Sequence, residues 1–337
     1  MSLGSLLAAS EPLPSPGEEA VVCVAVATMW TAPGAVRPVD EPALRVPARP
    51  RDWVEAMTPE ERTDLDGRTL TQLLLGERVQ VVELHGDWAR VIALGQPSSL
   101  DPLGYPGWMP AYQLSTVDGI HVAGVRVAAR HRDRDAVRDR TGVWHIVEAT
   151  ATALRDDPDA ALAVPGVTFG TRLLALGAPH DGWLPVAVPG RFEPAWAIED
   201  DVAAVPDEAP ADHAEVLAMA DRLRDVPYVW GGVSAYGVDC SGLVYLAWRR
   251  FGITLPRDAH DQAAATTQIE LGQEQPGDLY FFARPGKGVH HVAFVASAPV
   301  GDTRLMLHAC GELGRVVLEP IAGERAETLV AVHRVTT

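Results

Sequence analysis

The pattern of apolar and polar positions divides the chain into two parts that predict different elements. Residues 20–200 form short apolar runs broken by Gly, Pro and Asp, which is typical of small all-β domains. Helical spacing begins at residue 213, and a second helical pattern starts at Cys240, after a Gly-rich loop. Strand patterns then cover 278–283, 290–296, 303–310 and 329–335. Helices followed by an antiparallel sheet predict an α+β domain at the end of the chain.

A hairpin pattern occurs twice in the first part. The segment 77–94 reads as two strands around a turn before Trp88, and 171–188 repeats the design with Trp183 in the matching position. An aromatic element follows each hairpin, at 107–114 and at 192–198. The two copies resemble bacterial SH3-like domains, which implies two small all-β barrels.

Three segments interrupt this repeat. An insertion over roughly 35–70 contains Thr58-Pro59-Glu60-Glu61, a capping box that predicts a helix start. Residues 129–140 alternate in charge and predict a solvated connector. Residues 202–212 are rich in Pro, Ala and acidic residues and predict a domain boundary. We therefore expect domains over 1–125, 126–204 and 205–337.

Composition excludes several classes of partner. The 28 Lys and Arg against 45 Asp and Glu give a net charge of −17, which repels nucleic acid and anionic lipid. No apolar run reaches the length of about 18 residues that a membrane helix needs. The first residues show no secretory signal pattern, and the three cysteines are few and far apart. We expect free thiols and a cytoplasmic protein, or a secreted one if a signal peptide is missing from this chain.

Cys240 has the position of a nucleophile. The predicted helix begins at this residue and ends near Gly252, so the thiol lies in the first turn. Unpaired backbone N–H groups and the helix dipole favour a negative charge there, so we expect the thiol pKa to be lowered. The same N–H groups can stabilise the oxyanion of an acyl-transfer intermediate.

Two histidines are candidates for the base and its orienting partner. If the last strands form a hairpin over 297–302, His291 lies directly opposite His308 and on the same face, whereas His290 points to the other face. Cys310 shares the face of His308, but it has no helix dipole, so we interpret it as a packing residue. Cys23 lies in an apolar run and is expected in a core. We expect no metal and no cofactor, since no His or Cys pair has close ligand spacing.

The last part of the chain resembles a known family. PYVWGG, GVDCSGLV, GITLPRDAHDQ, QPGDLYFF, HVAFV and LHAC occur in the order found in NlpC-type peptidoglycan cysteine peptidases, over about residues 213–337. The resemblance implies a multi-domain protein in which two SH3-like barrels precede an α+β papain-like domain with an antiparallel sheet. It also implies hydrolysis of murein-derived peptides at the bond between γ-D-glutamate and a diamino acid, diaminopimelate or lysine.

The resemblance assigns roles to individual residues. Cys240 matches the nucleophile, His291 the base and His308 the orienting residue, and Tyr228 lines the nucleophile pocket. The resemblance implies that Asp239 is the acid that binds the free α-amine of L-alanine in the substrate. Charge supports this role, since a buried carboxylate needs a cationic partner and the substrate would bring one.

Five further residues are expected near the substrate. Ser241, Arg257 and Asp258 match pocket positions, with Arg257 a partner for the D-glutamate carboxylate. The alternative for Arg257 and Asp258 is a loop salt bridge. Glu83 and Tyr105 are candidates for a wall that the first barrel adds to the pocket, so that only short peptides with a free amine fit.

Two other functions remain open at this point. The same Cys-His-His site serves an amidase or an acyltransferase on another amide or ester. The chain is alternatively a cell-wall binding protein whose peptidase domain is inactive, although the intact set of Cys240, His291 and His308 disfavours this hypothesis.

Overall fold

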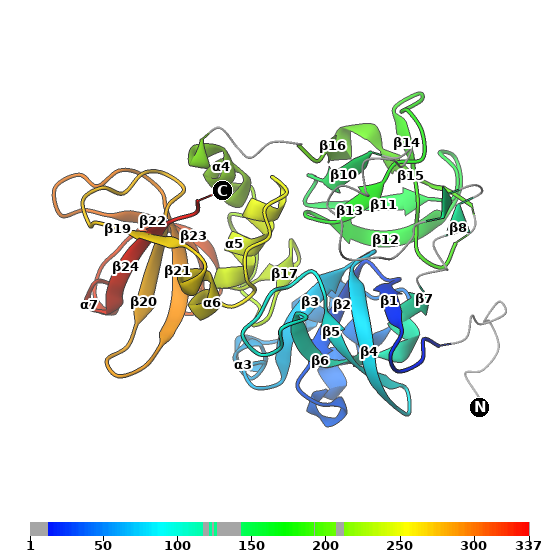
Figure 1. Cartoon of the computed structure of the whole chain (residues 1–337), viewed down its shortest axis with the longest axis horizontal. Coiled ribbons are helices and arrows are strands. Elements are labelled where there is room, and N and C mark those ends of the chain that lie inside the picture. Colours follow the sequence, from blue (N-terminus) through cyan, green and yellow to red (C-terminus); the bar gives the residue numbers. More distant parts are fainter. Residues whose placement is uncertain are drawn as a thin grey trace.

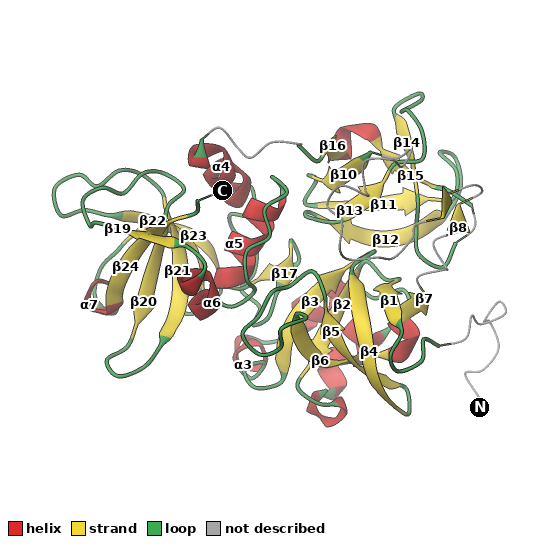
Figure 2. Ribbon diagram, viewed as in Figure 1, coloured by secondary structure: helices red, strands yellow, loops and turns green. Residues whose placement is uncertain are grey.

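The computed structural model describes residues 13–116, 121–122, 125–126, 143–191, 193–206 and 212–336. These residues form three sheet-rich regions (Figure 1). The first region carries a few short helices beside its strands, the second is mostly strands and loops, and the third contains the longer helices (Figure 2). Every strand pair within the described sheets is antiparallel, as the alternating patterns predict.

The first region contains a seven-stranded sheet in the order β3-β2-β6-β5-β4-β1-β7. The bounds of its strands are β1 Glu19–Val22, β2 Val26–Trp30, β3 Thr69–Leu74, β4 Arg78–His85, β5 Trp88–Ala93, β6 Tyr105–Pro110 and β7 Leu114–Thr116. The predicted hairpin at 77–94 is confirmed as β4 and β5, in which His85 pairs with Trp88. No described pairing joins β3 to β7, so the sheet is open and the expected closed barrel is not confirmed.

The insertion into the first region is helical, as expected. Its α-helices are α1 Glu41–Leu44, α2 Pro50–Ala56 and α3 Pro59–Thr63. The predicted capping box begins α3: the Thr58 hydroxyl accepts from the backbone N–H of Glu61, and the Glu61 carboxylate accepts from the N–H of Thr58. Short 3₁₀ turns at 33–35 and 38–40 lead into these helices.

The second region is built from two small sheets, in the orders β13-β10-β16 and β12-β11-β15-β14. The strands are β10 Trp144–Val147, β11 Ala151–Arg155, β12 Leu162–Thr168, β13 Arg172–Leu174, β14 Trp183–Val186, β15 Ala195–Ile198 and β16 Val202–Ala204. The hairpin expected at 171–188 is irregular, because β13 and β14 belong to different sheets and meet only through isolated bridges such as His180 with Trp183.

Some expected features of this part lie elsewhere than predicted. The boundary segment at 202–212 begins with β16, which belongs to the second region, and 207–211 lie outside the described residues. The connector at 129–140 also lies outside them. A two-stranded pair, β8 His121–Val122 with β9 Val125–Arg126, precedes it.

The third region combines helices with a six-stranded sheet in the order β19-β24-β20-β21-β22-β23. The helices are α4 His213–Asp221, α5 Cys240–Arg249, α6 Ala259–Ala264 and α7 Glu324–Thr328. The strands are β17 Val233–Ser234, β18 Gly237–Val238, β19 Thr267–Ile269, β20 Leu279–Ala283, β21 Val289–Val295, β22 Leu305–Cys310, β23 Arg315–Pro320 and β24 Leu329–Arg334. The predicted strands and the helix from Cys240 are confirmed, and β23 is an additional edge strand.

Helix α5 lies at the centre of a core to which all three regions contribute. Its side chains from Cys240 to Arg249 are all buried. Val26 and Leu74 of the first region and Phe169 of the second belong to the same apolar cluster as α5. The helix ends as predicted, with Gly252 in the left-handed conformation at a φ of 78°. The first sheet is therefore held firmly against the helix that begins at Cys240.

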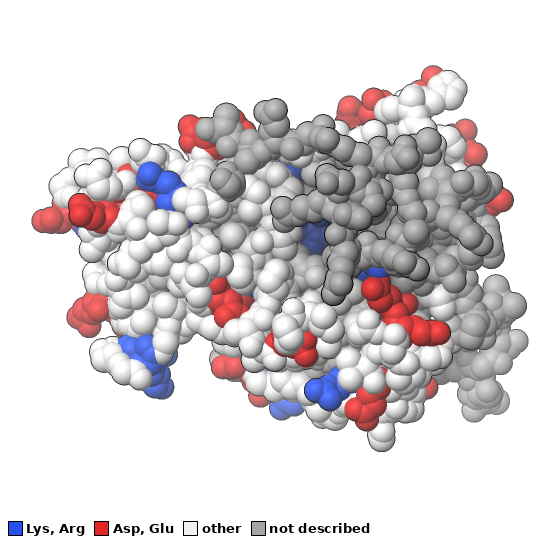
Figure 3. All heavy atoms as spheres, viewed as in Figure 1, with Lys and Arg blue, Asp and Glu red and all other residues white. Residues whose placement is uncertain are grey.

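The outer surface carries charges of both signs. Figure 3 shows acidic and basic side chains in small separate groups over one face. Among the residues described, no helix is long and apolar enough to cross a membrane.

Candidate active site

The start of α5 is built to hold Cys240 in one place. Asp239 is the N-cap, and its Oδ1 accepts from the backbone N–H of Gly242 at 2.7 Å. A Cβ at Gly242 would lie 2.2 Å from the carbonyl oxygen of Gly232, so only glycine allows the preceding loop to pack so close to the helix. Cys240 is consequently fixed at the first helical position, with 8% of its surface exposed.

The thiol is not acidic, contrary to the expectation from its helix position. Burial, followed by the negative charge of Asp239, raises the pKa of Cys240 to about 12. Backbone N–H groups of Val292 and Ser241 and the charge of Arg257 lower this pKa in part. The helix terminus does not lower the thiol pKa overall, because Asp239 accepts from the N–H of Gly242 and adds a negative charge beside the sulfur. The resting nucleophile is a thiol that needs a base.

His291 and His308 are in contact, although the expected register is wrong. Phe294 pairs with Leu307, so β21 and β22 are offset by two residues from the pairing that would place the histidines directly opposite each other. A shift of two residues preserves the face, and the rings meet diagonally. The distance from Nε2 of His291 to Nδ1 of His308 is 2.8 Å. His290 is exposed on the other face, as predicted.

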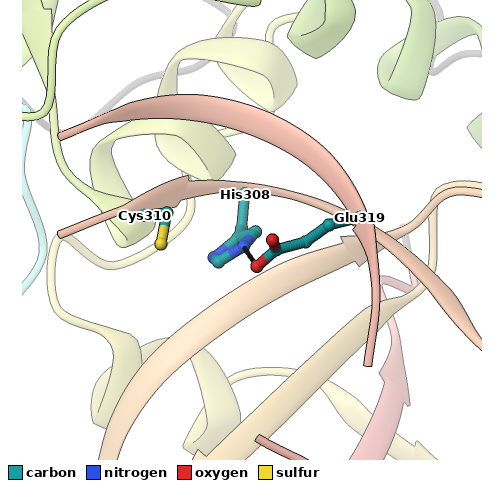
Figure 4. Close-up of side chains that lie close together, drawn as sticks. All are labelled: His308, Cys310 and Glu319. Atoms are coloured by element: carbon teal, nitrogen blue, oxygen red, sulfur yellow. Dashed lines mark hydrogen bonds and ion pairs between the residues drawn. The ribbon is translucent and has the colours of Figure 1, made fainter. Parts of the chain in front are cut away.

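A carboxylate that the sequence analysis missed completes this arrangement. Oε1 of Glu319 lies 3.0 Å from Nε2 of His308. Glu319 belongs to β23, the strand that was not predicted, and it pairs with Met306 in the sheet. Its side chain reaches back along the sheet to His308 from the neighbouring strand (Figure 4).

The three groups form a hydrogen-bond chain with one consistent direction. An ionised carboxylate only accepts, so Glu319 takes a hydrogen bond from Nε2–H of His308. A neutral His308 then has its lone pair at Nδ1, which accepts from Nε2–H of His291. A neutral His291 therefore keeps its lone pair at Nδ1, available to a thiol proton. Burial, followed by the charges of Arg325 and His308, lowers the pKa of His291 well below its ordinary value, so this ring is neutral at pH 7.

A pocket of about 620 Å³ connects the nucleophile to the first region. The third region lines it with Tyr228, Asp239, Cys240, Ser241, Asp258 and His291, among others. The first region lines it with Thr31, Asp66, Gly67, Thr69, Leu70 and Tyr105. Tyr105 thus belongs to the expected wall. Glu83 does not, because it is exposed on β4 and outside the pocket lining.

Asp239 and Arg257 form a buried ion pair, which changes the interpretation of both. The guanidinium of Arg257 donates to Oδ1 of Asp239 at 3.0 Å and to Oδ2 at 2.6 Å. Further hydrogen bonds go to Ser241 and Thr71, and Arg257 is 1% exposed. The structure favours the salt-bridge alternative for Arg257, with Asp239 as the partner rather than Asp258. Asp239 has its cation within the protein and does not depend on a substrate amine for one.

Asp258 is the carboxylate that faces the pocket beside the first region. It accepts a hydrogen bond from the hydroxyl of Tyr105, at 3.1 Å to Oδ2. Burial raises the pKa of Asp258, while the charge of Arg257 lowers it in part. Asp66 adds a second carboxylate from the first region. A cation placed between these walls would gain from both.

Cys310 and Cys23 differ from Cys240 in their surroundings. Cys310 is buried on β22, its Sγ lies 3.1 Å from Oε2 of Glu312, and burial raises the pKa of its thiol. Cys23 is half-buried against the core of the first sheet. Neither lies at a helix start or in the lining of the pocket that contains Cys240.

A thiol at a helix start, a neutral imidazole in the same pocket and a second imidazole orienting the first define the site of a cysteine peptidase. The NlpC/P60 family matches residues 225–334. The gamma-D-glutamyl-L-lysine dipeptidyl-peptidase of Bacillus subtilis (strain 168) is 36% identical over 276 residues, which cover 80% of this chain and 84% of the relative. The chain belongs to the NlpC/P60 family.

Two further proteins are similar over most of the chain. The gamma-D-glutamyl-L-lysine dipeptidyl-peptidase of Bacillus cereus (strain ATCC 10987 / NRS 248) is 32% identical over 86% of this chain and 83% of the relative. The crystal structure of an NlpC/P60 family protein from Bacillus cereus ATCC 10987 superposes with a TM-score of 0.79 at 29% identity. That match covers 94% of this chain and 99% of the other, so the likeness includes the two N-terminal regions.

Proposed function

We propose that this protein hydrolyses the bond between γ-D-glutamate and a diamino acid in murein peptides that have a free N-terminal L-alanine, with release of L-Ala-γ-D-Glu. The observation that carries the proposal is the shared pocket, in which Tyr105 of the first region donates to Asp258 of the third and both line the pocket with Cys240. The two relatives named as dipeptidyl-peptidases support it. The intact Cys240, His291 and His308 favour hydrolysis over a binding role.

The chemistry follows from the hydrogen-bond chain. Cys240 Sγ attacks the γ-carbonyl carbon while its proton passes to Nδ1 of His291. His291 returns that proton to the amine of the diamino acid as the C–N bond breaks, which leaves L-Ala-γ-D-Glu as a thioester on Cys240. Water then loses a proton to His291 and hydrolyses the thioester.

The oxyanion of each tetrahedral intermediate has donors nearby. The backbone N–H groups of Cys240 and Ser241, in the first turn of α5, would donate to the oxygen of the carbonyl that Cys240 attacks. Burial raises the pKa of Tyr228 well above its ordinary value, so its hydroxyl stays protonated and can donate. Tyr228 and Cys240 both line the pocket.

Amine recognition is the step that separates this function from a general murein endopeptidase. We assign it to Asp258, in place of Asp239, because Asp239 is already neutralised by Arg257 and caps α5. The substrate ammonium would donate to Asp258, whose charge is disfavoured by burial without it. Ser241 remains a pocket residue and supports Arg257.

The test compares L-Ala-γ-D-Glu-L-Lys with an N-acetylated copy. We expect the wild type to favour the free amine roughly 10- to 100-fold in kcat/KM, the range for a hydrogen bond to a charged group. In Asp258→Asn the ratio should fall toward one. Asp261→Asn is the matched control, because Asp261 lies three residues on and outside the pocket lining.

Two results would contradict the proposal. Equal kcat/KM of the wild type on both peptides would show that the enzyme does not recognise the free amine. If the protein with an intact Cys240 hydrolyses neither peptide, the proposed peptidase function is wrong.

The finer description of the N-terminal part belongs to this proposal. The repeated hairpins that contain Trp88 and Trp183 support two SH3-like domains. Boundaries at 1–125, 126–204 and 205–337 fit the three sheet-rich regions, except that the pocket uses residues from both the first and the third.

A further inference from the structure

A second group of chemically active side chains lies behind the histidine pair. His308 and Cys310 are two residues apart on β22, so both point to the same face of the sheet, and Glu319 reaches them from β23 (Figure 4). The ligand atoms of these three residues all lie within 4.8 Å of one another. In the proposed peptidase reaction His308 orients the base and Glu319 orients His308, but Cys310 has no role.

A smaller cavity gives access to this group, and it shares Arg284, Glu312 and Arg325 with the pocket that contains Cys240. It has a volume of about 290 Å³ and is lined by Cys310, Glu312, Glu319 and Arg325, together with residues of the α7 segment. Glu312 follows β22 and brings a second carboxylate to within 3.1 Å of the Cys310 sulfur. Cys310, Glu312 and Glu319 therefore face the same small space.

The donor set matches one class of ligand. A tetrahedral zinc site with bonds of about 2.0–2.3 Å has its ligand atoms roughly 3.5 Å apart. The pairs His308 Nε2 with Glu319 Oε1, at 3.0 Å, and Cys310 Sγ with Glu312 Oε2, at 3.1 Å, are already near that spacing. The ligand atoms of His308, Cys310 and Glu319 lie within 4.8 Å of one another, so a small contraction would bring these three to that spacing, and Glu312 would supply the fourth ligand.

The charges are also suitable. A Cys310 thiolate with Glu312 and Glu319 carries three negative charges, and Arg325 contacts Glu312 at 2.9 Å with one positive charge. A divalent cation would bring the group to neutrality. Sulfur and imidazole donors favour Zn²⁺ over Mg²⁺ or Ca²⁺.

We propose that His308, Cys310, Glu319 and Glu312 form an inhibitory site for Zn²⁺ or a similar thiophilic divalent cation, behind the catalytic base. Binding releases the Cys310 thiol proton to solvent. The metal also takes Nε2 of His308, so this ring must carry its proton at Nδ1 and donate to Nε2 of His291. His291 passes its Nε2 proton to Nδ1 of His308. The proton displaced from Nε2 of His308 moves through water to Nδ1 of His291.

The consequence is a reversed hydrogen-bond chain. His291 with a proton at Nδ1 has no lone pair toward Cys240 and cannot accept the thiol proton. Because His308, Cys310 and Glu319 lie outside the lining of the pocket that contains Cys240, the cation would inhibit the peptidase without contacting Cys240.

The binding test uses Cys240→Ala, which removes the nucleophile as a competing ligand and makes the result independent of peptidase activity. We expect calorimetric titration with Zn²⁺ to give one site, and Co²⁺ to give a thiolate-to-cobalt absorption band. Adding Cys310→Ala should weaken Zn²⁺ at least tenfold and remove the band, whereas adding Cys23→Ala as the matched control should change neither.

A second variant covers the case in which loss of the buried Cys310 disturbs folding. Glu312→Gln in the Cys240→Ala protein changes a side chain that is 68% exposed, and it should weaken Zn²⁺ roughly tenfold. Unchanged Zn²⁺ affinity in both the Cys310 and the Glu312 variants, with the cobalt band retained, would overturn the proposal.

The inhibition test uses the otherwise native protein. Zn²⁺ should inhibit the wild type and Cys23→Ala alike, while Cys310→Ala should remain active and require at least tenfold more Zn²⁺. If Cys310→Ala is as sensitive as the wild type, the inhibitory cation binds at Cys240 and His291, and the inhibitory role of this site is refuted.

Discussion

Cys240 and Cys310 are two buried thiols near the same histidine pair, and only one has the surroundings of a nucleophile. They are 8% and 3% exposed, and burial raises the pKa of both. Cys240 has backbone N–H groups at its sulfur and faces the larger pocket. Cys310 has the Glu312 carboxylate at its sulfur and faces the smaller cavity.

The comparison shows that thiol acidity does not select the nucleophile in this protein. The two cysteines differ in their relation to the base. The hydrogen bond from Nε2 of His291 to Nδ1 of His308 leaves the lone pair of His291 at Nδ1, available to Cys240. On the side of Cys310 the chain ends in carboxylates, which cannot donate to an oxyanion and repel a thiolate. Position relative to the base therefore decides between the two cysteines.

The largest expected effect is the difference in activity between the Cys240→Ala and Cys310→Ala variants. Cys240→Ala should lower kcat/KM by about 10⁴-fold or more, because the covalent route is lost. Cys310→Ala should retain activity within about threefold and lose about 1 kcal/mol of stability from the small cavity. Initial rates on L-Ala-γ-D-Glu-L-Lys and thermal unfolding measure both; substantial activity in Cys240→Ala would contradict the assignment.

A smaller effect should follow from breaking the chain at its far end. Glu319→Ala removes the acceptor that holds the His308 proton at Nε2, so the wrong ring tautomers become populated. We expect kcat to fall roughly 10- to 100-fold, the range for loss of an outer group that orients a histidine, with little change in KM. Glu319→Gln, whose amide oxygen still accepts, should lose less than Glu319→Ala. Equal kcat in the wild type and Glu319→Ala would show that Glu319 has no positioning role.

The smallest effect is a shift of the pH profile. The pKa of His291 lies well below its ordinary value of about 6.5, so kcat/KM should decline only as the pH falls well under that value and the base becomes protonated. Arg325 contributes to this lowering, so Arg325→Gln should move the acid limb toward higher pH, and Arg325→Lys should leave it nearly in place. An acid limb near pH 6.5 that is insensitive to Arg325→Gln would refute this cause.

Local patterns were sufficient for much of the third region. The helix from Cys240, its end at Gly252 and the faces of His290 and His291 all follow from spacing between near neighbours in the chain. The contact between His291 and His308 was predicted from a register that was wrong by two residues. It survived because an even shift keeps side chains on the same face of the sheet.

The features that were missed depend on distant contacts. Glu319 lies on β23, whose apolar residues are consecutive and do not alternate with polar ones, and nothing in the sequence ties Glu319 to His308. The partner of Asp239 is Arg257, which comes from a loop 18 residues on. The thiol pKa was predicted in the wrong direction because burial by the other regions cannot be read from a helix start. The open sheet of the first region likewise depends on pairing between distant strands.

Covalent labelling with a substrate-like reagent tests the central comparison most directly. L-Ala-γ-D-Glu carrying a diazomethyl ketone in place of the scissile amide should modify Cys240, as mapped by peptide mass spectrometry. Its N-acetylated copy should react roughly 10- to 100-fold more slowly, matching the selectivity expected for the substrate. Labelling at Cys310, or equal labelling rates by the two reagents, would contradict the account.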